Sequence, residues 1–84
     1  SIDNLAIHTA SEYGHVKIVR LLLSDSRVDP SVDDNWAIQI ASFNGHLEVV
    51  RLLLSDPRVN PSSKDNQAIR LAAENGQIDV VKLL

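Results

Sequence analysis

This 84-residue chain contains three histidines and no cysteine. Imidazole is therefore its side chain that titrates near neutral pH. His15 and His46 each follow a glycine, at equivalent places 31 residues apart, which indicates that they belong to a repeated scaffold. His8 has glutamine and arginine at its equivalent positions, so we interpret it as a surface contact or an ordinary polar residue. The histidines therefore predict neither a metal site nor acid–base catalysis.

Four aspartates gather in one stretch, where carboxylates are the usual ligands of a hard cation: Asp25, Asp29, Asp33 and Asp34. The stretch lacks the glycine and the terminal glutamate of a calcium-binding loop, so a solvated loop is the expected structure. The sequence contains no glycine-rich phosphate loop and no arrangement that suggests a catalytic triad. We therefore predict no catalytic, cofactor-binding or metal-binding residue, and a protein that is not an enzyme.

Composition argues against several other classes of function. The formal net charge of -3 and the pI near 5.4 oppose binding to nucleic acid or to an anionic membrane surface. No apolar run approaches the roughly 18 residues that span a bilayer, and the N-terminus lacks the pattern of a signal peptide. Because the absence of cysteine favours a reducing compartment, we expect an intracellular protein, located in the cytoplasm.

The chain matches itself when it is shifted by 31 residues. Between the first two copies 19 of 31 positions are identical, and Asp3-Asn4 falls on Asp34-Asn35 and on Asp65-Asn66. A period of this length indicates one supersecondary unit stacked on its neighbours. We therefore expect a single domain over residues 1–84, made of repeats 3–33, 34–64 and a truncated 65–84.

A glycine divides each copy into two apolar stretches of helical length, at Gly14, Gly45 and Gly76. The first predicted helix, about 5–13, has apolar residues at the i, i+3, i+4 spacing of one face, and Asp3 or Asn4 is expected to cap it. The second, about 16–24, is apolar around most of its circumference and must be buried on several sides. Extended or turn connectors are expected between the copies, because each contains a proline or two: Pro30, Pro57 and Pro61.

The second helices carry a repeated signature. Residues 14–23 (GHVKIVRLLL) recur as 45–54 (GHLEVVRLLL) and, in shorter form, as 76–84 (GQIDVVKLL). This pattern resembles the second-helix signature of ankyrin repeats. The resemblance implies an all-α solenoid of helix-turn-helix repeats with short hairpin-like or extended connectors. It also implies that His15 and His46 hold the turn together by hydrogen bonds.

The chain departs from the ankyrin pattern at two places. The usual Thr-Pro-Leu-His opening of the first helix is replaced by Leu5-Ala6-Ile7-His8 and its counterparts, so a set of hydroxyl–imidazole hydrogen bonds is lost. The repeat is also shorter than the usual length of about 33 residues, and the glycine after the second helix is missing. We therefore expect the finger-like hairpin between repeats to be shorter or reshaped.

Exposed positions that differ between the copies are free to recognise a partner, whereas repeated positions hold the stack together. In ankyrin repeats the first helices and the fingers line a concave groove that binds partner proteins. The resemblance therefore implies a protein–protein interaction module that uses this concave face. The predicted partner-binding residues are Glu12, Tyr13, Trp36, Phe43, Asn44, Arg70, Glu74 and Asn75.

All the aromatic residues, Tyr13, Trp36 and Phe43, fall at varying positions and favour an apolar anchor, because aromatic side chains dominate binding hot spots. In the alternative interpretation Trp36 packs over a neighbouring repeat, and the chain is a structural spacer of a longer array with no partner site of its own. Exposure of the three rings on one surface would favour binding. Burial between repeats would favour the spacer.

The sequence begins without methionine and stops within its last predicted helix, so we expect a fragment of a longer ankyrin-repeat protein. Terminal repeats need a polar outer face, whereas residues 80–84 are mostly apolar. Further repeats would cover that face. Without them, we expect fraying or end-to-end self-association through the uncapped C-terminal repeat.

Overall fold

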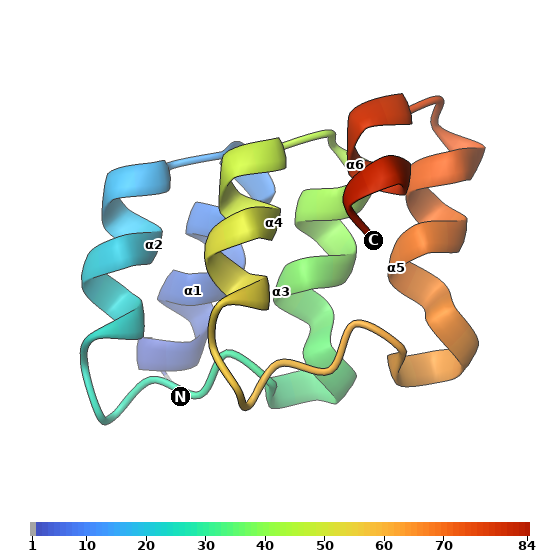
Figure 1. Ribbon diagram of the computed structural model, residues 1–84. Coiled ribbons are helices and arrows are strands. Elements are labelled where there is room, and N and C mark those ends of the chain that lie inside the picture. The colour runs from blue at the N-terminus through green and yellow to red at the C-terminus, as the bar shows by residue number, and fades with distance from the viewer. Residues whose placement is uncertain (1) are drawn as a thin grey trace.

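The computed structural model describes residues 2–84, with side chains from Asn4 onward, and these residues form three pairs of helices. The first helices of the pairs are α1 (Ile2–Tyr13), α3 (Val32–Phe43) and α5 (Ser63–Glu74). The second helices are α2 (Val16–Leu23), α4 (Leu47–Leu54) and α6 (Ile78–Leu83). Figure 1 shows the pairs side by side, with tight turns at one end and connectors at the other. The predicted all-α architecture is confirmed.

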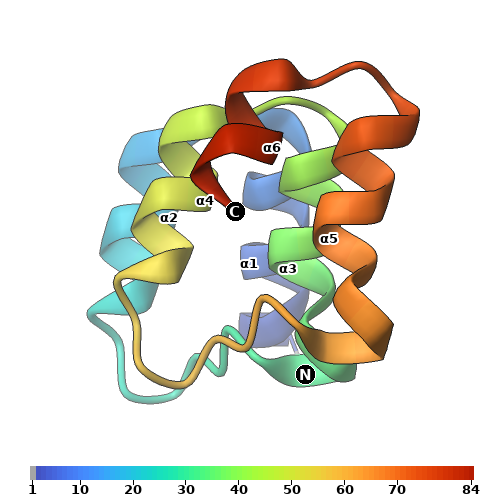
Figure 2. The same ribbon diagram turned by 45° about the vertical axis from the view of Figure 1, so that its right-hand side comes forward.

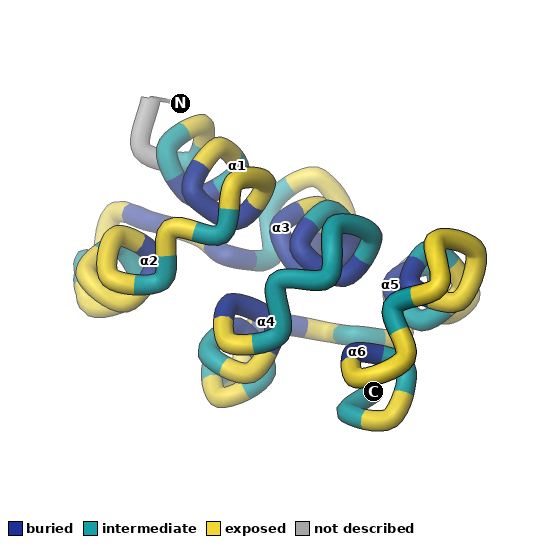
Figure 3. The backbone as a smooth tube through the Cα atoms, turned by 90° about the horizontal axis from the view of Figure 1, so that it is seen from above, coloured by how far each residue is buried: buried dark blue, intermediate teal, exposed yellow. Residues whose placement is uncertain are grey.

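The helices form two rows. Seen from above in Figure 3, α1, α3 and α5 make one row, and α2, α4 and α6 make the other. Figure 2 looks obliquely along the stack, with α5 in front of α3 and α3 in front of α1. Each helix packs against its partner in the pair and against the next helix of its own row. This stacking is how a repeat that cannot bury its apolar faces alone becomes stable.

One apolar core lies between the two rows and continues through all three pairs. The first helices contribute small residues: Ala10, Ala41 and Ala72 are at most 3% exposed, so neighbouring helices approach closely. The second helices contribute branched residues such as Val50 and Leu53, which are fully buried. Burying each such side chain stabilises the fold by about 1.5–3 kcal/mol relative to leaving it exposed.

A left-handed turn, which was not predicted, begins α3 and is repeated at the start of α5. Asp33, Asp34 and Asn35 have φ values of 55°, 57° and 66°, and regular right-handed helix starts at Trp36, where it was expected. Asn35 does not cap its own helix. Its Oδ1 instead accepts a hydrogen bond of 2.8 Å from the backbone N–H of Asn60 in the following connector. Asparagine tolerates the left-handed region better than most residues, so this position favours it.

Side-chain hydrogen bonds shape the connectors, and no strand occurs within residues 2–84. In the second connector the Asp56 carboxylate accepts bonds from the backbone N–H of Arg58 (2.9 Å) and from its Nε and Nη2 (3.0 and 2.8 Å). Arg58 Nη1 also donates to the carbonyl of Val28 in the first connector, at 2.9 Å. These bonds from Arg58 lower the pKa of Asp56. The expected reshaping of the finger therefore takes the form of an arginine clamp between successive connectors.

Candidate functional site

The outer side of the α1, α3 and α5 row carries an apolar stripe on its central helix. Trp36, Ile40 and Phe43 follow the i, i+4, i+7 spacing, which aligns them on one side of α3 over about 10 Å of helix. Trp36 is 40% exposed, and Ile40 and Phe43 are half-buried. We call these three residues the α3 stripe. Ile40 was not among the predicted contacts, although it differs from its equivalents, Thr9 and Leu71, and the comparison between copies could have identified it.

Beside Trp36 lies a shallow hollow of about 440 Å³, lined by His8, Asp33, Asp34, Trp36 and Lys64. At its rim His8 Nε2, which is buried and has no hydrogen-bond partner among the described residues, lies 3.7 Å from Asp33 Oδ2, and Lys64 Nζ lies 3.8 Å from Asp34 Oδ2. Both aspartate side chains are about 70% exposed, so these contacts are weak and exchange with solvent or a ligand at little cost. The hollow combines an aromatic wall with charged groups that remain accessible.

The three aromatic rings do not form a single anchor. Tyr13 is 62% exposed at the C-terminal end of α1, whereas Trp36 lies near the opposite end of α3. Tyr13 instead stands beside His15, with ring centroids 6.2 Å apart. Phe43 shares the α3 stripe with Trp36 and lies at the Tyr13 end of the row. The rings are therefore divided between the α3 stripe, which holds Trp36 and Phe43, and the α1–α2 turn, where Tyr13 lies beside His15.

Two of the predicted contacts also take part in holding the stack together. Asn44 Nδ2 donates to the carbonyl of Glu12 at 3.0 Å, and Asn75 Nδ2 donates to the carbonyl of Phe43 at 2.8 Å. The residue two positions after each asparagine contacts the same carbonyl: His46 Nε2 lies 2.9 Å from Glu12 O, and Gln77 Nε2 lies 3.2 Å from Phe43 O. One backbone carbonyl thus receives two donors from the next repeat. The side chain of His46 therefore bonds to the preceding repeat and not, as the resemblance implied, within its own turn.

A side chain from the next repeat also explains why a glycine precedes α2 and α4. Gly14 has a φ of 73°, and a Cβ added there would lie 2.6 Å from His46 Nδ1. Gln77 covers Gly45 in the same way. His15, the equivalent residue in the first repeat, is exposed.

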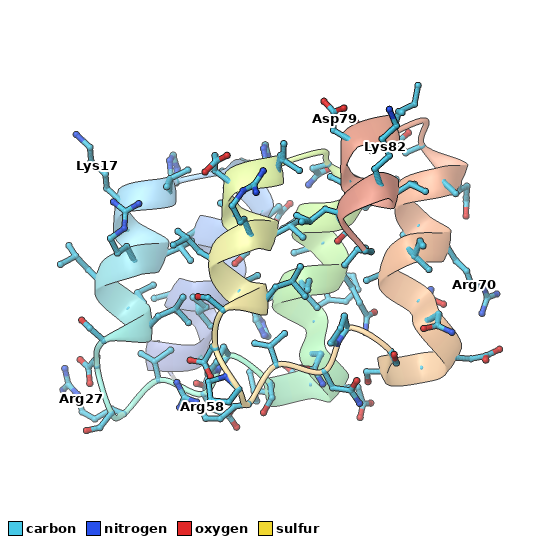
Figure 4. All side chains as sticks on the ribbon, viewed as in Figure 1. Lys17, Arg27, Arg58, Arg70, Asp79 and Lys82 are labelled. Carbon is cyan, nitrogen blue, oxygen red and sulfur yellow. The ribbon has the colours of Figure 1, made fainter. Side chains whose placement is uncertain are left out.

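The remaining predicted contacts, Glu12, Arg70 and Glu74, are exposed. Figure 4 shows Arg70 projecting outward from α5, and its Nη1 lies 3.8 Å from Asp65 Oδ2. The two rows carry opposite charge. The described parts of the first helices hold more carboxylates than cations: Glu12, Asp33, Asp34, Asp65 and Glu74 against Lys64 and Arg70. The second helices hold more cations than carboxylates: Lys17, Arg20, Arg51 and Lys82 against Glu48 and Asp79.

Among the residues that the structure describes, no three histidine, aspartate or glutamate side chains are grouped closely enough to hold a metal ion. The Asp25 carboxylate instead pairs with Arg27, whose hydrogen bonds lower the pKa of Asp25 to about 2. Asp29 accepts hydrogen bonds from the backbone N–H and the hydroxyl of Ser31, and these bonds lower its pKa. Across the same described range, no helix is long and apolar enough to cross a membrane.

Comparison with known proteins agrees with this geometry. A family model described as ankyrin repeats matches residues 7–84 as three copies. A search of curated proteins gives no match. Since the family match extends over all three helix pairs and far more than half of the sequence, the chain belongs to the ankyrin repeat family.

Proposed function

We propose that this chain is a non-catalytic interaction module that binds a partner protein through the expected concave face of the stack, the side of α1, α3 and α5 that faces away from the core. Ankyrin repeats generally bind proteins and are typically non-catalytic. The observation that carries the proposal for this face is Trp36, the only tryptophan, which remains 40% exposed beside an open hollow. A half-exposed indole beside a hollow is the type of group that acts as a hot spot when a partner excludes water from it.

The rest of this face supports the same proposal. The α3 stripe extends the apolar surface along one helix, while Glu12, Arg70 and Glu74 supply a polar rim around it. A central apolar strip within a charged rim is the usual anatomy of a protein interface. The excess of carboxylates on this row favours a partner that brings basic groups. We further propose an intracellular location, because the absence of cysteine fits a reducing compartment.

The alternative, a spacer without its own partner site, is favoured by one specific observation. The amides of Asn44 and Asn75 are engaged by carbonyls of the preceding repeat, so these residues serve the stack whether or not a partner binds. We therefore propose Asn44 and Asn75 as contacts only for a partner that reaches the turns between the paired helices. Trp36 and Tyr13 have no comparable hydrogen-bonded role among the described residues, and their exposure favours binding over the spacer.

End-to-end association is a second contact that we propose for this chain. Gly14 and Gly45 are covered by His46 and Gln77, but no described atom lies within 4 Å of a Cβ placed on Gly76. The exposed His15 of a second copy has the same side chain as His46 and would fit over Gly76. Such a head-to-tail contact would repeat the interface that already joins successive repeats within the chain.

The test of partner binding uses the single tryptophan as its own reporter. Binders are selected from a random peptide library against the chain, and each binder is titrated while the fluorescence of Trp36 is recorded. Binding over the stripe should shift the emission to shorter wavelength, because water is excluded from the indole. Trp36→Ala should weaken binding at least tenfold, or about 1.4 kcal/mol.

The matched control is Leu21→Ala, since Leu21 is 70% exposed on the opposite row. This change should leave affinity unaltered. Binders that leave the Trp36 emission unchanged and tolerate Trp36→Ala would overturn the proposed face. Failure to obtain any binder at micromolar concentration would favour the spacer.

A further inference from the structure

The hollow beside Trp36 is built by three successive repeats. Asp33, Asp34 and Trp36 come from α3, His8 comes from α1 and Lys64 comes from α5. The hollow therefore lies in the middle of the row of first helices rather than at either end of the stack. Its volume of about 440 Å³ is that of a small-ligand pocket, so it accommodates one long side chain of a partner.

The left-handed turn at the start of α3 brings two carboxylates to the same hollow as the indole. Residues two positions apart on a right-handed helix do not face each other, so Asp34 would there diverge from Trp36. With φ values of 55° and 57°, Asp33 and Asp34 leave the right-handed helix, and both line the hollow together with Trp36. The same turn begins α5, but there the equivalent residues are Lys64, Asp65 and Gln67. The pairing of two carboxylates with a tryptophan is thus particular to the second repeat.

These two carboxylates are open to a ligand, unlike those of the connectors. Asp25 and Asp56 each accept hydrogen bonds from the arginine two residues later. The nearest described cationic groups lie 3.7 Å from Asp33 and 3.8 Å from Asp34, too far for hydrogen bonds. Both side chains are about 70% exposed. A donor brought by a partner would therefore meet acceptors that no described residue has bonded.

The charges around the hollow favour a cation. With histidine counted as neutral, two carboxylates face one ammonium, that of Lys64. The Lys64 side chain is 59% exposed and makes only the contact of 3.8 Å with Asp34, so a better donor can replace it at little cost. The His8 side chain is 16% exposed and closes the hollow on the α1 side.

A guanidinium suits this set of groups better than an ammonium does. It is flat and weakly hydrated, so it stacks on an indole ring. Its five N–H donors lie in a fixed plane and can reach two carboxylates at once. An ammonium is compact and strongly hydrated, and it matches neither feature as well.

We propose that the hollow binds an arginine side chain of the partner protein, stacked on Trp36 and hydrogen-bonded to Asp33 and Asp34. This arginine site rests on the proposed function, because it names the group that a partner places on this face. The bound guanidinium displaces the Lys64 ammonium from Asp34. Arginine is also among the residues that most often dominate protein interfaces, which fits a seat beside the exposed tryptophan.

The experiment compares two random peptide libraries that differ at one position. The central residue is arginine in one library and glutamine in the other, and the flanking positions exclude arginine, lysine and histidine. Each library is selected against the whole chain, and the enriched peptides are titrated while the fluorescence of Trp36 is recorded. The best arginine peptides should bind about tenfold more tightly than the best glutamine peptides, or more, since glutamine supplies neither the stacking cation nor the charged hydrogen bonds. Replacing the arginine with lysine should weaken binding about fivefold.

Variants of the chain test which groups hold the arginine. Asp33→Asn combined with Asp34→Asn removes both carboxylates, and asparagine tolerates the left-handed region, so the turn is retained. Arginine peptides should bind this variant about tenfold less tightly, and changing their arginine to glutamine should then cost less than about twofold. The matched control is Asp65→Asn, the same change in the equivalent turn of α5, where the carboxylate is 93% exposed and does not line the hollow. This control should leave affinity within about twofold of wild type.

The outcomes separate the arginine site from the proposed face. Glutamine peptides that bind as tightly as arginine peptides and change the Trp36 emission would refute the arginine site and leave the proposed face standing. Equal losses in the Asp65→Asn control and in the double variant would refute it too, because the charge effect would then be general. If neither library yields a peptide that changes the emission, the arginine site and the proposed face both fail.

Discussion

The clamp between the connectors should contribute more stability than its exposure suggests. Arg58→Ala removes two hydrogen bonds to the Asp56 carboxylate and one to the carbonyl of Val28, a residue that is 1% exposed. The Arg58 side chain is 43% exposed, so its ion pair with Asp56 contributes no more than about 0.5–1 kcal/mol. Losing the charged donor to a buried carbonyl adds about 1 kcal/mol, at the lower limit for such bonds because of that exposure.

We therefore expect Arg58→Ala to lower the free energy of unfolding by about 1.5–2 kcal/mol, or to lower Tm by roughly 6–16 °C for a domain of this size. Urea denaturation followed by circular dichroism measures it. The control is Arg51→Ala, since Arg51 is 57% exposed and makes only an i, i+3 contact of 3.5 Å with Glu48. That change should cost at most about 0.5 kcal/mol. If both variants lose the same amount, the bond to Val28 contributes nothing and the clamp argument is wrong.

Three further changes test other parts of the stack. Ser42→Ala should raise stability by about 1 kcal/mol in the same urea assay, because the Ser42 hydroxyl is fully buried without a hydrogen-bond partner among the described residues; a loss would indicate an unrecognised partner. Gly45→Ala should cost about 1 kcal/mol or more, since Gly45 has a φ of 74° and a Cβ there would displace the side-chain amide of Gln77; an unchanged urea midpoint would contradict this. Asp56→Asn should be destabilising near neutral pH and indistinguishable from wild type in strong acid. The lowered pKa of Asp56 gives stability that is present above the ordinary aspartate pKa and is lost as pH falls through the folded value, which pH-dependent urea midpoints would follow.

Much of the fold was predictable because its elements are set by local patterns that recur. The turn glycines and the apolar stretches located all six helices, and the second helices at Val16–Leu23 and Leu47–Leu54 end within one residue of the expected position. The left-handed start of α3 was not predictable in this way. Three consecutive residues with positive φ have no propensity signal beyond the aspartates and the asparagine themselves. They are held by a bond that Asn35 makes to Asn60, 25 residues away.

The ties between repeats were also missed, for a physical reason. Asn44 and Asn75 looked like free variable positions because Tyr13 replaces them in the first copy. In the structure each amide needs a carbonyl in the preceding repeat, and the first repeat has none before it within the described residues. The difference between the copies did not reveal that these two asparagines serve stacking. A comparison between repeats cannot distinguish a side chain that bonds to the neighbouring repeat from one that faces a partner, because both contacts lie outside its own repeat.

The residues whose carbonyls accept these asparagine amides illustrate how stacking and recognition are separated. The stack uses Glu12 and Phe43 only through their backbone carbonyls, which accept the amides of Asn44 and Asn75. A residue of any type has this backbone carbonyl, so glutamate and phenylalanine are equally compatible with the hydrogen bond. The hydrogen bond itself makes no use of their side chains, of which that of Glu12 is exposed and that of Phe43 is half-buried. A partner can therefore be selected by changing these positions while the hydrogen bonds between repeats stay intact. Phe43, unlike Asn44, thus remains a contact candidate whose replacement should leave those hydrogen bonds in place.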